Sequence, residues 1–237
     1  MVFAVLLSGG TGTRLGAARP KQYIEVDGRS VLSYSVEAIL RSERIQAVQV
    51  VAAPQWQAYI AQQLETLGGL HQLRGFSSPG RNRQESIYNA LRDCIPQLRE
   101  DDAVLIHDAA RPLLSTELIN RCILALDGHD GVLPVLQMRD TVYLSQNGKS
   151  ISSLLPREKI FAGQAPELFL FGKYYRANQS LLPNDEILRI NGSTEPAISA
   201  GMDVVMIPGD ETNFKITTGA DLRRFRETRS RMGGARR

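Results

Sequence analysis

Residues 2–16 read VFAVLLSGGTGTRLG, an apolar run that stops at a glycine-rich segment. Six apolar residues followed at once by glycines are typical of a buried parallel strand that leads into a loop. Glycines let backbone N–H groups approach a phosphate closely, and the start of a following helix adds a favourable dipole. The beginning of the chain therefore predicts an α/β fold with an anion-binding loop after its first strand.

The same alternation continues along the chain. Apolar runs predict strands at residues 2–7, 47–53, 103–106 and 131–136. Helical spacing of apolar residues predicts helices at residues 31–40, 55–67, 84–98 and 115–126. Because strands that alternate with helices of about 10–15 residues form βαβ units, we expect a mostly parallel sheet between two layers of helices.

A hairpin signal interrupts this pattern. Two β-prone runs, residues 140–144 and 150–154, flank Ser-Gln-Asn-Gly at 145–148, and Asn-Gly between such runs favours a tight turn. We expect a protruding β-arm at about residues 138–158, inserted in a single domain that spans residues 1–237. The rest of the chain predicts an apolar segment at 167–171, helices at 172–182 and from 193, a strand at 203–207, a short strand at 214–216 and a terminal helix from 221.

Composition and charge exclude several classes of protein. The chain has 237 residues, of which 43% are hydrophobic and 22% charged, which excludes a disordered chain, a collagen-like repeat and a small disulfide scaffold. The net charge is +3, but residues 219–237 hold seven arginines and two acids. A nucleic-acid-binding face would spread its cations over the fold. We therefore interpret the tail as a solvated helix and expect no nucleic-acid partner, with attraction for RNA or phosphate as the alternative.

Two further features concern the cell compartment. No apolar run approaches the length that a membrane span needs, and the two cysteines, Cys94 and Cys122, have no metal-binding or disulfide spacing. We expect a soluble, cytoplasmic protein with reduced, buried thiols and no membrane partner.

The first loop contains two cations, Arg14 and Lys21, seven residues apart. It matches neither the dinucleotide pattern, because Leu15 stands where the last glycine belongs, nor the GxxxxGK phosphate loop. Two fixed cations beside glycines suit a polyphosphate whose charge must be neutralised while a bond breaks. The alternative is a structural turn with solvated basic side chains.

A second candidate stretch, IHDAARP at 106–112, follows the strand predicted at 103–106. Open α/β sheets bind ligands at the carboxyl ends of their strands. Asp108 could hold Mg²⁺ there and Arg111 a phosphate, although Asp108 could instead cap the loop. We interpret His107 as a packed residue.

Two weaker signals complete the candidate site. In PGRNRQES, residues 79–86, backbone amides and Ser86 could contact a base edge, but an ordinary helix cap explains the stretch equally well. Lys215 lies in NFKITT, residues 213–218. A lysine inside an apolar strand is costly unless it meets an anion, so Lys215 is a candidate phosphate ligand; the alternative is that it reaches out to solvent.

In this order, the motifs resemble those of the polyol-phosphate cytidylyltransferases, a similarity that covers about residues 2–225. The motifs are GGTGTRLG at 9–16 with PKQ at 20–22, HDAARP at 107–112, RDT at 139–141, GQAPELF at 163–169 and NFKITT at 213–218. The resemblance implies a three-layer, Rossmann-like nucleotidyltransferase fold. It also implies Mg²⁺-dependent transfer of CMP from CTP to a polyol phosphate, and a homodimer in which the arm of one subunit contributes to the site of the other.

The resemblance also implies residue roles. Arg14, Lys21 and Lys215 would be catalytic, stabilising charge on the triphosphate, and Asp108 would bind the metal ion. The nucleotide would be bound by Ser8, Gly9, Gly10, Thr11, Gly12, Gly80 and Ser86. The polyol phosphate would be bound by Arg111, Thr141 and Arg157.

The acceptor stays open at this stage. HDAARP and RDT favour the enzymes that use 2-C-methyl-D-erythritol 4-phosphate for isoprenoid precursors, which we place first because that pathway is widespread in bacteria. GGTGTR and GQAP favour the ribitol 5-phosphate enzymes that make CDP-ribitol for cell-surface polymers. The segment STEPA at 193–197 departs from the TDEA-like segment of the methylerythritol enzymes. A different nucleotidyltransferase and a non-catalytic CDP-binding protein remain as further alternatives.

Overall fold

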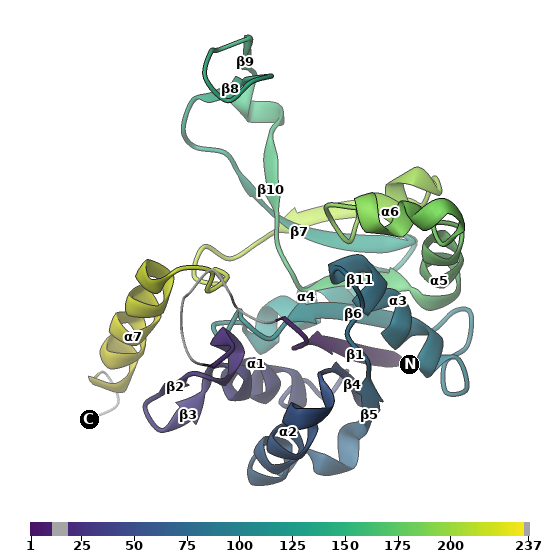
Figure 1. Cartoon of the computed structure of the whole chain (residues 1–237), viewed down its shortest axis with the longest axis vertical. Coiled ribbons are helices and arrows are strands. Elements are labelled where there is room, and N and C mark those ends of the chain that lie inside the picture. The colour runs from purple at the N-terminus through teal and green to yellow at the C-terminus, as the bar shows by residue number, and fades with distance from the viewer. Residues whose placement is uncertain (11–18, 235–237) are drawn as a thin grey trace.

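The computed structural model describes residues 1–10 and 19–234. Within this part of the chain, a central sheet of eight strands has helices on both faces (Figure 1). The strand order is β10-β7-β11-β6-β1-β4-β5, and β12 pairs with β7. The strands are β1 (Val2–Leu7), β4 (Ala47–Val51), β5 (Leu73–Ser77), β6 (Ala103–Asp108), β7 (Gly131–Gln137), β10 (Phe161–Gly163), β11 (Glu167–Leu170) and β12 (Val204–Pro208).

Most of the strand pairs of the central sheet are parallel, as predicted. β1 pairs in parallel with β4 and β6, β4 with β5, and β12 with β7. β11 is antiparallel to both β6 and β7, and β10 is antiparallel to β7. Two short ribbons lie outside this sheet: β2 (Glu25–Val26) pairs with β3 (Arg29–Ser30), and β8 (Val142–Leu144) pairs with β9 (Ser153–Leu155).

The helices connect successive strands. The α-helices are α1 (Val31–Leu40), α2 (Pro54–Thr66), α3 (Arg83–Cys94), α4 (Thr116–Ala125), α5 (Phe171–Gln179), α6 (Glu195–Ser199) and α7 (Gly219–Gly234). The 3-10 helices are η2 (Lys21–Tyr23), η3 (Leu70–Gln72), η4 (Arg157–Lys159) and η5 (Pro183–Arg189). The helix predicted at 84–98 ends at Cys94 because Pro96 cannot continue it.

Strand β6 shows how the three layers form. Leu105 belongs to the core that β6 shares with α1, α2 and α4, whereas Val104 and Ile106 belong to the core shared with α3 and α5. Successive side chains of a strand point to opposite faces, so a strand covered on both faces must be apolar throughout. The predicted three-layer α/β class is therefore confirmed.

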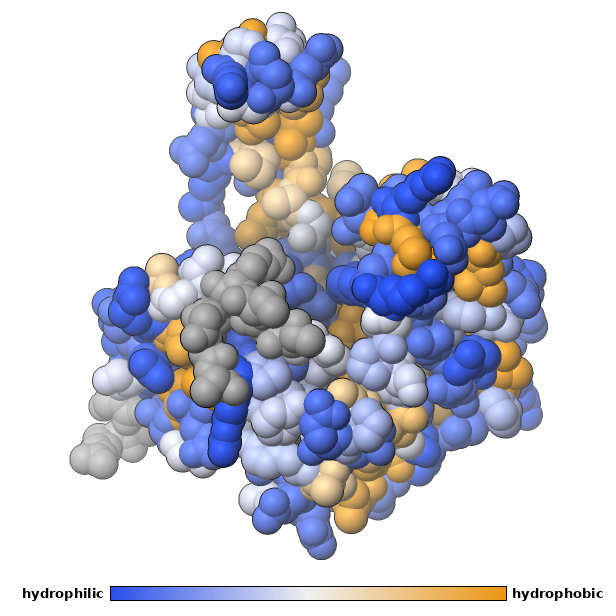
Figure 2. All heavy atoms as spheres, viewed as in Figure 1, coloured by the Kyte–Doolittle hydropathy of each residue, from blue (hydrophilic) through white to orange (hydrophobic). Residues whose placement is uncertain are grey.

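The arm projects away from the sheet at the top of Figure 1. The predicted hairpin is present, but its strands β8 and β9 are shorter than predicted because the tip is an eight-residue loop. In that loop the Asn147 side-chain oxygen accepts hydrogen bonds from the backbone N–H groups of Lys149 and Ser150. Figure 2 shows hydrophobic residues along the stalk that joins the arm to the sheet. The exposed hydrophobic residues of this region include Phe161 of β10 and Leu154 of β9.

The terminal helix α7 packs against the body. Phe225 is fully buried in a small core that includes Tyr34. Two arginines of the tail lie over aromatic rings: the Arg224 guanidinium is 4.1 Å from the Phe214 ring centroid, and that of Arg229 is 4.8 Å from the ring centroid of Tyr34. The terminal helix is therefore partly packed against the body, whereas its charge predicts a helix surrounded by solvent.

Two further expectations can be compared with the structure. None of the described helices combines the length and the apolar character that crossing a bilayer requires. Cys94 and Cys122 are both buried and unpaired, and burial raises the pKa of each thiol to about 12.

Some of the sequence predictions differ from the structure. Residues 214–216 form no strand, because only the Ile216 N–H reaches a neighbouring segment, at the Ala110 carbonyl oxygen, 2.8 Å away. The helix expected from Ser193 is present as α6, although it begins at Glu195. Strand β5 was missed because Gly75 and an adjacent arginine interrupt its apolar pattern.

Candidate active site

A cavity of about 440 Å³ opens at the carboxyl ends of the parallel strands. The last residues of β1, β4 and β6 line it, together with the first residue of α3. This is the edge at which open α/β sheets bind ligands. The lining residues are Leu7, Gly9, Gly10, Lys21, Gln22, Val51, Pro79, Gly80, Arg81, Asn82, Arg83, Ser86, Asp108, Ala110, Lys215 and Thr217.

Two glycines allow the loops around this cavity to pack closely. A Cβ on Gly9 would lie 2.7 Å from the ring of Pro79, which follows β5. A Cβ on Gly80 would lie 2.7 Å from backbone atoms of Glu85 and Ser86 in α3. Both distances are too short for a side chain, so only glycine fits at either position.

A side-chain amide fixes the loop after β1. The Gln22 Nε2 donates to the backbone oxygens of Ser8 and Gly10, at 2.8 Å each. The Tyr23 hydroxyl also donates to the Ser8 carbonyl oxygen, and the Ser8 hydroxyl donates to Tyr23. Because a trans peptide directs its N–H opposite to its C=O, these bonds also fix the direction of the Gly9 N–H. Ser8 therefore packs behind the loop, and its side chain does not line the cavity.

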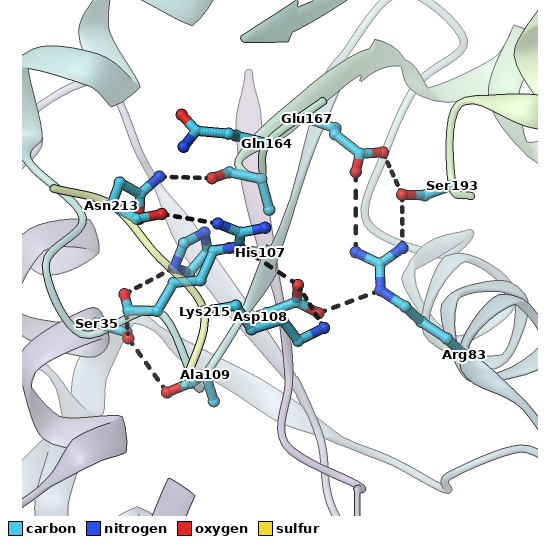
Figure 3. A network of polar contacts seen from close by, with 12 residues as sticks. Ser35, Arg83, His107, Asp108, Ala109, Gln164, Glu167, Ser193, Asn213 and Lys215 are labelled. Carbon is cyan, nitrogen blue, oxygen red and sulfur yellow. Dashed lines mark hydrogen bonds and ion pairs between the residues drawn. The ribbon is translucent and has the colours of Figure 1, made fainter. Parts of the chain in front are cut away.

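Asp108 lies at the centre of an ion cluster (Figure 3). Its Oδ1 is 3.1 Å from Nε of Arg83, and its Oδ2 is 3.0 Å from Nζ of Lys215 and 3.7 Å from Nε of Arg111. Burial opposes ionisation of Asp108, but the three cations outweigh it, so the pKa of this carboxyl lies well below its usual range. Three cations around one carboxylate leave an excess of positive charge, which suits an anionic ligand.

Lys215 is held in place from two sides. Arg111 donates from Nη1 to the Asn213 carbonyl oxygen at 2.7 Å, two residues before Lys215. On the other side, the N–H and hydroxyl groups of Thr217 and Thr218 all donate to the Asp221 carboxylate. Burial raises the pKa of Asp221, but these hydrogen bonds outweigh it and lower the pKa to about 2. Lys215 thus points into the cluster and not to solvent, although its segment is irregular.

The adjacent His107 has a structural role, as we interpreted from the sequence. It is fully buried, and burial lowers its pKa to about 3. Its Nε2 is 3.4 Å from the Arg111 carbonyl oxygen. A neutral, enclosed imidazole is not placed to exchange protons with a ligand in the cavity.

Asn82 and Ser86 each make a hydrogen bond that organises the start of α3. Asn82 is the N-cap, accepting a hydrogen bond from the Glu85 N–H at 2.8 Å. Ser86 has a different contact: its hydroxyl accepts from the Gly80 N–H at 2.9 Å and so closes the turn that lines the cavity.

The structure brings together most, but not all, of the residues expected at the site. Those that line the cavity are Gly9, Gly10, Lys21, Gly80, Ser86, Asp108 and Lys215. Arg111 lies beside them, on Asp108. Thr141 and Arg157 lie in the arm, exposed and outside this cavity, where Arg157 donates to the Arg139 carbonyl oxygen. Thr11, Gly12 and Arg14 lie outside the described residues.

Sequence reasoning missed Gln22, Arg83, Glu167 and Ser193. Arg83 joins Asp108 to Glu167, residues 59 positions apart that no sequence spacing connects. The sequence holds one signal for Glu167, because this acid belongs to the segment 167–171, which is otherwise apolar. Burial raises the pKa of Glu167, while the charge of Arg83 acts against this shift.

A metal ion would find few protein ligands here. Among the described residues there is no group of three or more His, Cys, Asp or Glu side chains that could hold one. Mg²⁺ needs only one or two carboxylates when substrate phosphates supply the other oxygens. Asp108, as a single carboxylate in a cavity suited to anions, fits such a shared site.

Comparison with known proteins identifies the family. The family model of 2-C-methyl-D-erythritol 4-phosphate cytidylyltransferase matches residues 2–227. The chain belongs to this family. It is therefore an enzyme, a CTP-dependent nucleotidyltransferase, and the non-catalytic alternative is dismissed. The comparisons do not favour the ribitol 5-phosphate alternative.

Individual relatives agree with this assignment. The chain is 30% identical to the 2-C-methyl-D-erythritol 4-phosphate cytidylyltransferase of Clostridium beijerinckii, over 94% of this chain and 95% of that protein. It is 34% identical to the bifunctional enzyme IspD/IspF of Paramagnetospirillum magneticum, of which it spans 55%. The fold matches the crystal structure of 4-diphosphocytidyl-2C-methyl-D-erythritol synthase from Anaerococcus prevotii, with a TM-score of 0.82 at 23% identity over 97% of this chain and 96% of that one.

The contacts of Gln22 lead to a prediction about nucleotide binding. Gln22→Glu keeps the shape of the side chain but removes both N–H groups that hold the loop after β1. We expect the dissociation constant for CTP, measured by calorimetry, to rise about tenfold, as for the loss of two buried hydrogen bonds. Gln55→Glu, on the exposed side of α2, is the matched control and should bind CTP like the unmodified protein. Equal affinity in both variants would show that Gln22 does not organise the loop.

Proposed function

We propose that this chain transfers CMP from CTP to 2-C-methyl-D-erythritol 4-phosphate, giving a CDP-polyol and pyrophosphate. The observation that carries the acceptor is the family match along residues 2–227, reinforced by the Clostridium beijerinckii relative of almost equal length. The cation-rich cavity supports the same reaction class, because both substrates are phosphates.

The proposed mechanism is an in-line displacement. A phosphate oxygen of the acceptor attacks the α-phosphorus of CTP, a new P–O bond forms, and the bond to the β-phosphate breaks to release pyrophosphate. This chemistry needs no nucleophile from the protein, so positioning and charge stabilisation do the work. Lys21 and Lys215, both lining the cavity, would stabilise negative charge on the phosphates, and Arg14 is proposed as a third such cation.

The nucleoside would lie against the glycine-lined side of the cavity. Gly9 and Gly80 pack too closely to their neighbours to carry side chains, which leaves backbone groups to contact the base and ribose. Ser8 would contribute indirectly, through its carbonyl oxygen in the loop. The full proposed set is Ser8, Gly9, Gly10, Thr11, Gly12, Gly80 and Ser86.

Asp108 would hold Mg²⁺ together with phosphate oxygens of CTP. When bound, the ion would add positive charge beside the phosphates. Lys215 already contacts one oxygen of the Asp108 carboxylate and Arg83 contacts the other. These two side chains would therefore adjust as the nucleotide and the ion arrive.

We also propose a cytoplasmic homodimer, each chain being one domain with its arm at about residues 138–158. Thr141 and Arg157 are exposed and lie outside the chain's own cavity, which supports their binding the acceptor phosphate in the site of the other subunit, beside Arg111. A second cavity, of about 550 Å³, lies at the base of the arm and is lined by the exposed apolar side chains Phe161 and Met206. Such a surface favours contact with a second copy.

The acceptor is tested by measuring pyrophosphate release with CTP and Mg²⁺. We expect turnover with 2-C-methyl-D-erythritol 4-phosphate and at least 100-fold lower kcat/KM with ribitol 5-phosphate, because the site must discriminate between polyols by their hydroxyl groups. ATP, GTP and UTP serve as controls for the nucleotide. Faster turnover with ribitol 5-phosphate would contradict the proposed acceptor and leave the cytidylyl transfer intact.

The shared site is tested by mixing two inactive variants. Lys215→Ala damages the body of the site, and Arg157→Ala damages only the arm. A mixed dimer would contain one intact site, so random mixing should restore about a quarter of the unmodified activity. Each variant alone, refolded in the same way, is the control. Activity no higher than that of the two variants measured separately would contradict a site built from two subunits.

A further inference from the structure

Glu167 is a buried acid that the proposed mechanism does not use. It lies on β11, opposite Ile106 of β6, and is 8% exposed. It does not line the cavity. Burying a carboxylate is costly unless it is paired and hydrogen-bonded, so a sequence that keeps one here needs a reason other than packing.

Glu167 and Ser193 together hold one end of Arg83 (Figure 3). Nη1 of Arg83 donates to the Ser193 hydroxyl at 2.5 Å, and the Ser193 hydroxyl donates in turn to Glu167. Nη2 of Arg83 is 3.9 Å from Oε1 of Glu167. Ser193 itself is fixed, because its carbonyl oxygen accepts a hydrogen bond from the buried Tyr174 hydroxyl at 2.7 Å.

These contacts leave Arg83 with a one-point contact to Asp108. Only Nε of Arg83 reaches Asp108, at 3.1 Å. An arginine beside a carboxylate prefers two parallel hydrogen bonds. Here the outer nitrogen atoms are directed to Ser193 and Glu167, so the paired arrangement with Asp108 is not adopted. Arg83 lines the cavity, and its guanidinium has five N–H groups, so those that Asp108 and Ser193 do not use can contact an incoming phosphate.

We propose that Glu167 is a positioning residue, which acts through Ser193 to keep Arg83 from pairing fully with Asp108 and so keeps Arg83 available to the phosphates of CTP. Glu167 touches no substrate in this account. The inference rests on the proposed function only for the place of the phosphates, and CTP binding tests it without any acceptor.

The first experiment compares CTP with cytidine. Glu167→Gln keeps the size of the side chain and an acceptor for Ser193, but removes the charge. We expect the dissociation constant for CTP to rise about tenfold while that for cytidine, measured by competition, stays within about twofold, because only CTP carries phosphates. A general structural defect would weaken both ligands. Unchanged CTP affinity, or equal losses for the two ligands, would overturn the inference.

A second comparison uses the background of Arg83→Met. If Glu167 acts only by holding Arg83, Glu167→Gln should cause no further loss of CTP affinity once Arg83 is absent. A further tenfold loss in this background would show that Glu167 acts on its own and would overturn the inference.

The Ser193 hydroxyl provides a matched pair of variants that decides the matter if Glu167→Gln does not fold. Ser193→Ala removes the link between Glu167 and Arg83, whereas Ser193→Thr keeps a hydroxyl. We expect Ser193→Ala to weaken CTP binding about tenfold and Ser193→Thr to bind CTP within about twofold of the unmodified protein. Equal affinities in the two variants would overturn the link. Failure of the acceptor assay would contradict the proposed function alone, since none of these measurements uses an acceptor.

Discussion

The ion cluster on Asp108 is the interaction on which the rest of the site depends. One carboxylate, at the end of β6, is shared by Arg83 at the start of α3, Lys215 before α7 and Arg111 in the loop directly after β6. The cluster both ties these segments together and leaves them positively charged. Because the cations outnumber the acid, the cavity beside them suits phosphates, and the proposed in-line transfer would rely on charge and position.

The fold supplies this cluster through the common direction of its strands. The carboxyl ends of β1, β4 and β6 meet at one edge, so the loops that follow them line one cavity. Elsewhere in the lining of the cavity, close packing at Gly9 and Gly80 brings backbone groups within reach of a ligand. His107, although next to Asp108, is enclosed and serves packing.

Much of this could be predicted from the sequence because it is encoded locally. An apolar run before glycines indicated β1 and its loop, and another before HDAARP placed Asp108 at a strand end. The features that the sequence did not predict depend on contacts between residues that are not neighbours in the chain. Lys215 is positioned by Arg111 and Asp221 and not by a strand, and the pairing of Arg83 with Glu167 crosses the fold. The roles of the arm residues came from family resemblance, and they stay predictions.

The central claim is that positive charge around Asp108 recognises the phosphates of the nucleotide. Calorimetric titration with CTP and with CMP tests it most directly, in the unmodified protein and in Lys215→Gln. The account predicts that CTP binds at least tenfold more tightly than CMP, and that this ratio shrinks severalfold in Lys215→Gln. Equal affinities for CTP and CMP in the unmodified protein would contradict it.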